Sequence, residues 1–293
     1  MSIMRKPNLF IIGTYKSGST SLYRYLISMK NIAGGQVKET HYLDSMVYCD
    51  LSSKSVSLDE YSSYFPNDNA EYILDGTPSY FYGNDELRSF LKNEIIQYKL
   101  IVLLRNPADR FLSYYYYLKS LKLVNEDLGQ FFNHCLRHND GRETLHTGIY
   151  KNAIKEGFYI DYLVKWKDEM ECDNLKVYLT ENFSESPKDT LQNICAWLGI
   201  DNEALVNITR ENQTSIVKFP RLHAAVVKTC QILFTEKFRS LSIYRSLRDV
   251  YFYLAPTSSR DKSEEEIYKK LMEIYSEKNN ELFNYLGKPN VWG

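Results

Sequence analysis

Residues 8–26 place a buried strand, a short polar loop and a helix in immediate succession, and this order constrains the fold most. The apolar run at residues 9–12 predicts a strand that ends at Gly13, and apolar side chains at helical spacing follow. The loop between them, residues 14–20, reads TYKSGST and contains a single basic residue, Lys16. Backbone N–H groups and the helix dipole at such a helix start attract an anion. The segment therefore predicts a phosphate-binding loop.

This loop differs from the nucleotide-binding loop of kinases and ATPases. Gly13 and Gly18 have the G-x-x-x-x-G spacing of that motif. However, Ser19 occupies the position of the motif's lysine, and the lysine of this chain, Lys16, lies inside the loop. A P-loop kinase or NTPase therefore stays open as an alternative, although the displaced lysine argues against it.

A second strand and helix, at residues 98–119, carry a basic residue at a comparable position. An apolar run predicts a strand that ends just before Arg105, at the strand end where open α/β sheets bind ligands. Asn106 can cap a helix whose first residue is Pro107, because proline lacks only an N–H that the helix start does not use. Ser113 lies two turns along this helix, within reach of an anion bound by Arg105.

Together these segments resemble sulfotransferases that use 3′-phosphoadenosine-5′-phosphosulfate (PAPS). The first is similar to their 5′-phosphosulfate-binding loop, and the second to their R-[ND]-P-x-x-R-x-x-S-x-[YF] block. The resemblance implies that Arg105 and Ser113 hold the 3′-phosphate, the group that separates this donor from ATP. The donor-binding residues that it implies are Tyr15, Lys16, Ser17, Gly18, Ser19, Thr20, Arg105 and Ser113. The implied product is 3′,5′-ADP. No metal is expected, because lysine, arginine and backbone amides meet the donor's charge.

The stretch QVKETHYLD at residues 36–44 resembles the K-E-x-H-[FY] pattern of glycosaminoglycan and related bacterial sulfotransferases. In that group the matching glutamate is the catalytic base, which implies this role for Glu39. His41 competes with Glu39 as the base, and both alternatives remain open. We expect Lys16 to neutralise the bridging oxygen as the phosphate leaves.

The acceptor is not named by the sequence. Glycosaminoglycan enzymes often carry a lysine before the T-P-x-Y stretch, whereas this chain has Asp75 and Gly76 there, which argues against a long anionic glycan. The expected acceptor is a hydroxyl or amine of a small molecule or carbohydrate. A binding module that holds PAPS without catalysis is a further alternative, opposed by the presence of both Lys16 and Glu39.

Strand candidates alternate with helical stretches along the chain, which predicts a doubly wound parallel sheet. These candidates are residues 8–12, 72–75, 99–104 and 175–180. With the resemblance, this pattern indicates a three-layer α/β sandwich with a mainly parallel sheet. We expect one domain over residues 1–293, with irregular acceptor-side segments near 45–70, 120–147 and 205–262.

Composition restricts the partners. A length of 293 residues with 44% hydrophobic residues is sufficient for a full α/β core, and a net charge of −1 argues against nucleic acid. There is no signal-peptide pattern and no apolar run long enough for a membrane span. The five scattered cysteines fit a reducing compartment. We therefore expect a cytoplasmic bacterial enzyme that acts as a monomer or homodimer.

Three other patterns have simpler explanations. His134 and His138 are spaced for zinc on one helix face, but no third ligand follows in the order that zinc enzymes use. Asp75 ends a strand, as a nucleotide-site aspartate would, yet such an aspartate is common. The four tyrosines at residues 114–117 point in different directions on a helix, so we expect some to lie in the core and one or two to line the cleft.

Overall fold

A computed structural model of the chain describes residues 6–47, 56–65, 69–95, 97–139, 148–201 and 260–293. The chain divides into two compact units, Met1–Ile208 with Ser263–Gly293, and Thr209–Lys262. The second unit lies almost wholly outside the described residues. The expected single domain, and its acceptor-side segment near residues 205–262, therefore stay predictions.

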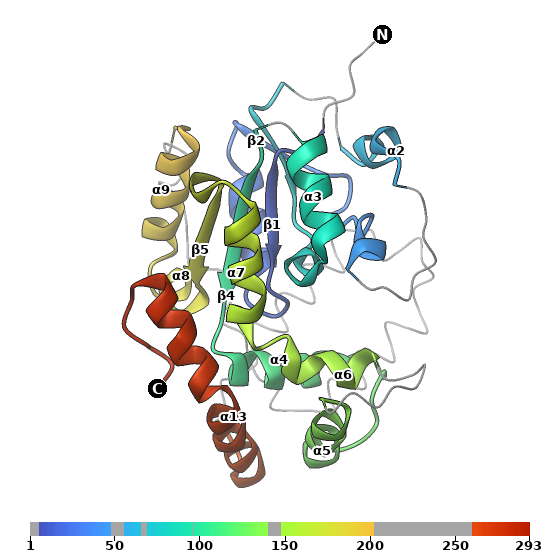
Figure 1. Cartoon of the computed structure of the whole chain (residues 1–293), viewed down its shortest axis with the longest axis vertical. Coiled ribbons are helices and arrows are strands. Elements are labelled where there is room, and N and C mark those ends of the chain that lie inside the picture. Colours follow the sequence, from blue (N-terminus) through green and yellow to red (C-terminus); the bar gives the residue numbers. More distant parts are fainter. Residues whose placement is uncertain (1–5, 48–55, 66–68, 96, 140–147, 202–259) are drawn as a thin grey trace. The chain divides into compact units, whose positions relative to one another are not determined.

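Five parallel strands form the central sheet, in the order β2-β3-β1-β4-β5 (Figure 1). Their bounds are β1 (Leu9–Gly13), β2 (Ile32–Gly34), β3 (Tyr72–Asp75), β4 (Lys99–Leu104) and β5 (Leu175–Leu179). The predicted parallel sheet is confirmed, and the four predicted strands lie within one residue of their expected bounds. Only β2 was not predicted, because three residues are too short to show a period.

Helices cover both faces of the sheet. One face packs against α1 (Ser19–Ile27) and α9 (Pro187–Leu198), and the other against α3 (Asp85–Glu94) and α7 (Tyr159–Glu169). Strand β1 needs a helical layer on each side, because its side chains alternate between the two faces of the sheet and every one of its residues is buried. The three-layer α/β sandwich is therefore confirmed.

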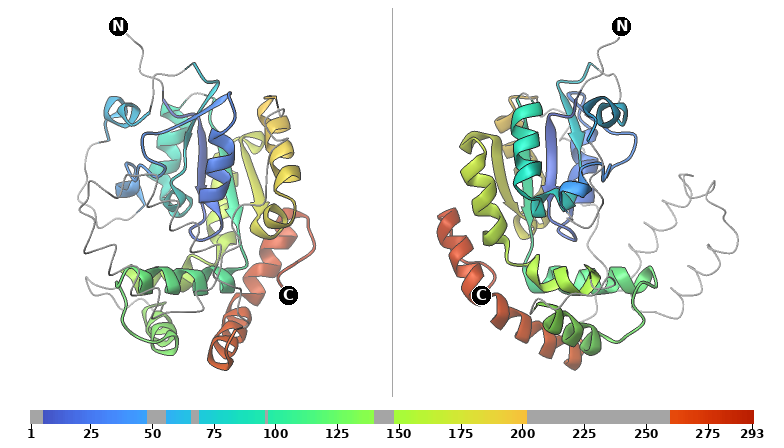
Figure 2. Two further views of the ribbon diagram at one scale, coloured as in Figure 1. Left: turned by 180° about the vertical axis from the view of Figure 1, so that it is seen from behind. Right: turned by 45° about the vertical axis from the view of Figure 1, so that its right-hand side comes forward.

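A separate group of helices shares a third apolar cluster (Figure 2). It consists of α4 (Pro107–Ser120), α5 (Leu128–Asn139), α6 (Gly148–Lys155) and α13 (Lys262–Leu286). Helix α5 lies within a segment that was expected to be irregular; Phe131, Phe132 and Cys135 bury one of its faces against this cluster. As the helical spacing predicts, the tyrosine run of α4 divides: Tyr115 is buried, whereas Tyr117 is 45% exposed.

The remaining elements are short. They are η1 (Asp44–Met46), α2 (Leu58–Ser63), η2 (Pro78–Tyr82), η3 (Cys172–Asn174) and α8 (Thr180–Glu185). Within the described ranges, no helix has both the length and the apolar character that crossing a membrane requires.

Candidate active site

The carboxyl ends of the parallel strands meet at one edge of the sheet, and the predicted site residues follow them there. The segments that leave this edge are residues 14–18 after β1, 35–43 after β2, 76–77 after β3, Arg105 after β4 and Thr180 after β5. Helix α4 also begins at this edge, directly after Arg105 and its neighbour Asn106 (Figure 1). This is the edge at which open α/β sheets bind their ligands.

The predicted phosphate loop joins β1 to α1. Lys16 and Gly18 both adopt the left-handed backbone conformation, with φ of 63° and 88°, which turns the chain tightly into the helix. Gly13 is required by space, because a Cβ atom there would lie 2.5 Å from Cβ of Phe81. No side chain of the described residues caps the start of α1. The first N–H groups of this helix have no carbonyl in a preceding turn to which they could donate, so they are suited to binding an anion.

Contacts from β4 and β5 hold the loop in place. The backbone N–H of Thr14 donates to the carbonyl of Leu103 at 2.9 Å. The guanidinium of Arg105 donates to the carbonyl of Lys16 at 3.1 Å, which links the two predicted donor-binding segments directly. Thr180 donates through its hydroxyl to the carbonyl of Ser17 at 2.7 Å. Sequence reasoning missed Thr180, since nothing in a lone threonine after a strand indicates a partner 163 residues away.

Lys16 lies within electrostatic range of both Arg105 and Glu39. Its ammonium nitrogen is 4.3 Å from the centroid of the Tyr117 ring, on helix α4. Burial and then the positive charge of Arg105 lower the pKa of Lys16 to about 8, while the negative charge of Glu39 acts in the opposite direction. The fold thus brings together three residues that the sequence analysis had placed in one site.

The second predicted segment has the expected local structure. The side-chain oxygen of Asn106 accepts from the N–H of Ala108 at 3.0 Å and caps α4, and Pro107 is the first helical residue. The Arg105 carbonyl accepts from the Tyr159 hydroxyl at 2.9 Å. Arg105 and Ser113 are both half-buried on this part of the fold.

The other predicted donor-binding residues surround the start of α1. Ser17 and Ser19 are buried, whereas Thr20 is exposed in the first turn. The Tyr15 ring stacks on Tyr82, with centroids 6.2 Å apart and planes 11° apart. The roles of these residues in donor binding stay predictions.

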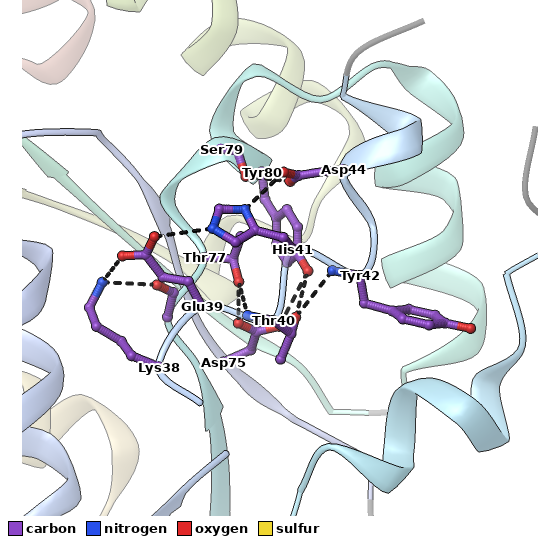
Figure 3. Close-up of polar contacts among 11 residues, drawn as sticks. Lys38, Glu39, Thr40, His41, Tyr42, Asp44, Asp75, Thr77, Ser79 and Tyr80 are labelled. Carbon is purple, nitrogen blue, oxygen red and sulfur yellow. Dashed lines mark hydrogen bonds and ion pairs between the residues drawn. The ribbon is translucent and has the colours of Figure 1, made fainter. Parts of the chain in front are cut away.

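The predicted base segment forms a connected set of charged groups (Figure 3). Lys38 pairs with the carboxylate of Glu39. Glu39 also lies 3.3 Å from Nε2 of His41, and the other ring nitrogen of His41 lies 2.8 Å from Asp44. Ser79 donates to the second oxygen of Asp44 at 2.5 Å. The sequence analysis did not single out Asp44, although its position three residues after His41 is a spacing that could have indicated this contact.

These contacts shift the pKa values of the two candidate bases in opposite directions. Burial acts to raise the pKa of Glu39, but the hydrogen bond from His41 and the charge of Lys38 outweigh it, so the pKa is lowered. Hydrogen bonds to Asp44 and then Glu39 raise the pKa of His41 to about 10. Near neutral pH, Glu39 is therefore an ionised carboxylate and His41 a charged imidazolium.

The histidines noted for zinc do not form a metal cluster in the described residues. His134 lies 2.7 Å from a carboxylate oxygen of Glu126, and Cys135 is buried as a free thiol in the helical cluster. The side chain of His138 lies outside the described residues. Within those residues, no group of three or more histidine, cysteine or acidic side chains could hold a metal ion.

Comparison with known proteins is consistent with this geometry. The family model described as "Sulfotransferase domain" matches residues 6–219. The chain is 23% identical over 210 residues to a bifunctional heparan sulfate N-deacetylase/N-sulfotransferase 1 of Caenorhabditis briggsae, a match that covers 68% of this chain and 24% of that protein. It is 33% identical over 155 residues to the membrane-associated sulfotransferase kil1 of Dictyostelium discoideum, covering 51% of this chain and 32% of that protein. The matches thus span about a quarter to a third of these relatives.

A solved structure shares the fold. The sulfotransferase of Alicyclobacillus acidocaldarius superposes with a TM-score of 0.57 at 19% identity, over 80% of this chain and 99% of that one. Because the family model covers well over half of the sequence, the chain belongs to the sulfotransferase domain family.

Proposed function

We propose that this protein transfers the sulfuryl group of PAPS to a hydroxyl or amine of a small molecule or carbohydrate and releases 3′,5′-ADP. The observation that carries the proposal is the hydrogen bond from Arg105 to the carbonyl of Lys16. It joins a loop suited to the 5′-phosphosulfate to an arginine suited to a 3′-phosphate. Membership of the sulfotransferase domain family supports the same donor.

The reaction moves an SO₃ unit from the 5′-phosphate oxygen to the acceptor. As the sulfur–oxygen bond to the phosphate breaks, negative charge grows on that oxygen, and the Lys16 ammonium neutralises it. The acceptor's oxygen or nitrogen forms the new bond to sulfur and gives its proton to Glu39. His41, already charged, cannot take that proton, so it holds the Glu39 carboxylate instead. Arg105 and Ser113 bind the 3′-phosphate and set the donor's position.

The space beside Gly76 bears on the acceptor. A Cβ atom at this residue would lie 2.6 Å from the Tyr23 ring, so a lysine here would require the ring to move. The Lys38 ammonium lies 3.3 Å from the Gly76 carbonyl and is already paired with Glu39. This arrangement supports an acceptor other than a long anionic glycan. The buried free thiols of Cys135 and Cys195 agree with the proposal that the enzyme works in a reducing compartment such as the cytoplasm.

Two measurements on the full chain test the proposed function. Thermal unfolding with 3′,5′-ADP or with Mg·ATP separates a sulfotransferase from a kinase, because only a ligand that binds the folded state raises the unfolding temperature. Incubation with ³⁵S-labelled PAPS and a panel of phenols, sugars and amines then separates an enzyme from a binding module. We expect stabilisation by 3′,5′-ADP and transfer to one acceptor class that Lys16→Ala abolishes. Stabilisation by Mg·ATP alone would contradict the proposal.

A further inference from the structure

Asp75 is a buried carboxylate at the carboxyl end of β3, and its side chain is 1% accessible. Its Oδ2 atom accepts hydrogen bonds from the hydroxyls of Tyr61 at 2.6 Å and Thr40 at 2.9 Å. Its Oδ1 atom accepts from Thr77 at 2.6 Å, and Tyr80 approaches Oδ2 at 3.4 Å. The donors come from the segment after β2, from α2, and from the chain after β3. One buried carboxylate therefore ties three stretches of chain together.

The hydrogen bonds to Asp75 hold their donors firmly because the accepting carboxylate is buried. Burial raises the pKa of Asp75, while hydrogen bonds from Thr77, Tyr61 and Thr40 act to lower it. An ionised carboxylate in such a place is costly unless hydroxyl donors satisfy it, and bonds to a charged acceptor are shorter and stronger than neutral ones. A donor to Asp75 is therefore fixed in position more strictly than a surface hydroxyl.

Thr40 stands between Glu39 and His41 in the sequence, and hydrogen bonds to Asp75, Thr77 and Tyr80 hold it. Its hydroxyl donates to Asp75, and its backbone N–H donates to the hydroxyl of Thr77 at 3.1 Å. Figure 3 shows Thr40 directed toward Asp75, with the Glu39 carboxylate directed toward the His41 ring. The residue that is tied to the buried carboxylate thus fixes the backbone from which both charged side chains project.

We propose that Thr40 and Asp75 are positioning residues for the base: their hydrogen bond holds Glu39 and His41 in the orientation that proton removal requires. This inference rests on the proposed function, because it assigns the purpose of a network beside the proposed base. Asp75 thereby has a role other than that of a nucleotide-site aspartate, since its oxygens are turned to hydroxyl groups of the protein.

Three variants of the full chain test this inference. Thr40→Val keeps the shape of the side chain but removes the hydroxyl, whereas Thr40→Ser keeps the hydroxyl. Tyr61→Phe is the matched control, because it removes another bond to the same oxygen of Asp75 and keeps the ring that stacks on Tyr42 of the base segment. Each variant is measured for kcat and for the KM of PAPS, for its affinity for 3′,5′-ADP, and for the titration of His41 by NMR.

We expect Thr40→Val to lower kcat by about tenfold to a hundredfold, since small misplacements of a catalytic group have effects of this size. Its affinity for 3′,5′-ADP should change by less than about twofold, because Thr40 hydrogen-bonds to Asp75, Thr77 and Tyr80, which are not proposed donor-binding residues. The pKa of His41 should fall below about 10, because the hydrogen bond to Glu39, the second contribution after the hydrogen bond to Asp44, loosens. Thr40→Ser should behave like the parent, and Tyr61→Phe should lose thermal stability while keeping kcat.

Two results would overturn the inference. The first is a Thr40→Val protein with the parent's kcat and His41 titration. The second is a Tyr61→Phe protein whose kcat falls as far as that of Thr40→Val, since Asp75 would then act only on general stability. The His41 titration needs no acceptor. If the parent transferred no sulfuryl group while Thr40→Val still shifted this titration, the proposed function would fail and the positioning of His41 would stand.

Discussion

The backbone of Lys16 is held in one conformation, and the surroundings of its ammonium lower its pKa. Its left-handed conformation and the hydrogen bond from Arg105 to its carbonyl hold the main chain of Lys16, so its side chain starts from a fixed position in the loop. Burial lowers its pKa to about 8. Lys16 is therefore charged below that pH and loses its charge above it, whereas an unfolded lysine stays charged to about pH 10.

This pKa predicts the alkaline side of the pH–rate profile. Because the proposed mechanism needs a charged Lys16 to stabilise the leaving phosphate, kcat/KM for PAPS should fall above about pH 8 in the free enzyme. Lys16→Arg should be slower, because a planar guanidinium does not reproduce a compact ammonium, but it should lack this fall. Initial rates from about pH 6 to about pH 10 test both points. The same fall in Lys16→Arg would show that another group titrates.

A second prediction at the residue scale distinguishes Glu39 from His41. Glu39→Gln keeps the size and some hydrogen bonding of the side chain but removes its basicity, so kcat should fall by roughly 10²- to 10⁴-fold with donor affinity nearly unchanged. His41→Asn should cost less, because in the proposed mechanism the charged ring only orients the Glu39 carboxylate. Single-turnover rates and 3′,5′-ADP affinities of both variants provide the test. A nearly active Glu39→Gln beside an inactive His41→Asn would reverse the assignment.

At the scale of elements, helix α4 begins beside the proposed 3′-phosphate site, because its capping residue, Asn106, directly follows Arg105. Asn106 caps the helix and donates through its amide to the hydroxyl of Tyr268 at 3.2 Å, on α13. Asn106→Ala should lower the free energy of unfolding by about 1 kcal/mol through loss of the cap. It should also weaken 3′,5′-ADP binding by about fivefold, the equivalent of ~1 kcal/mol, because Arg105 adjoins the frayed turn.

Asn84 provides a matched control for this prediction. It caps α3 through the N–H of Leu87 at 3.1 Å, and no residue of the proposed site lies on that helix. Asn84→Ala should therefore lose similar stability in urea unfolding and keep its affinity for 3′,5′-ADP. Equal losses of affinity in both variants would show that the effect reflects stability alone.

The elements also show what the sequence could predict. Apolar runs located β1, β3, β4 and β5 because buried parallel strands need such runs, and Asn106 with Pro107 marked a helix start by local chemistry. Contacts between distant residues had no local signal. Two such contacts are the hydrogen bond from Thr180 to the loop carbonyl and the position of the Lys16 ammonium over the Tyr117 ring. Both depend on how the sheet brings its strand ends together.

At the scale of the folded unit, the same sheet order explains why the site is composed of distant segments. The strand order places the chain after β1 between the segments after β3 and β4, so Lys16 lies within electrostatic range of Arg105, which follows β4. Glu39 follows β2, and its neighbour Thr40 hydrogen-bonds to Thr77 after β3, which brings Glu39 within range of Lys16 as well. The end of the chain supports this edge as well. Trp292 packs against Tyr159, with ring centroids 5.9 Å apart, and the hydroxyl of Tyr159 donates to the carbonyl of Arg105.

The central claim is that the protein binds a nucleotide with a 3′-phosphate. Calorimetric titration of the full chain with 3′,5′-ADP and with 5′-AMP tests it most directly, because the two ligands differ only in that group. We expect 3′,5′-ADP to bind at least about a hundredfold more tightly, and Arg105→Ala to remove most of the difference, because charge-assisted bonds to the phosphate are lost. Equal affinities for the two nucleotides in the parent protein would contradict the account.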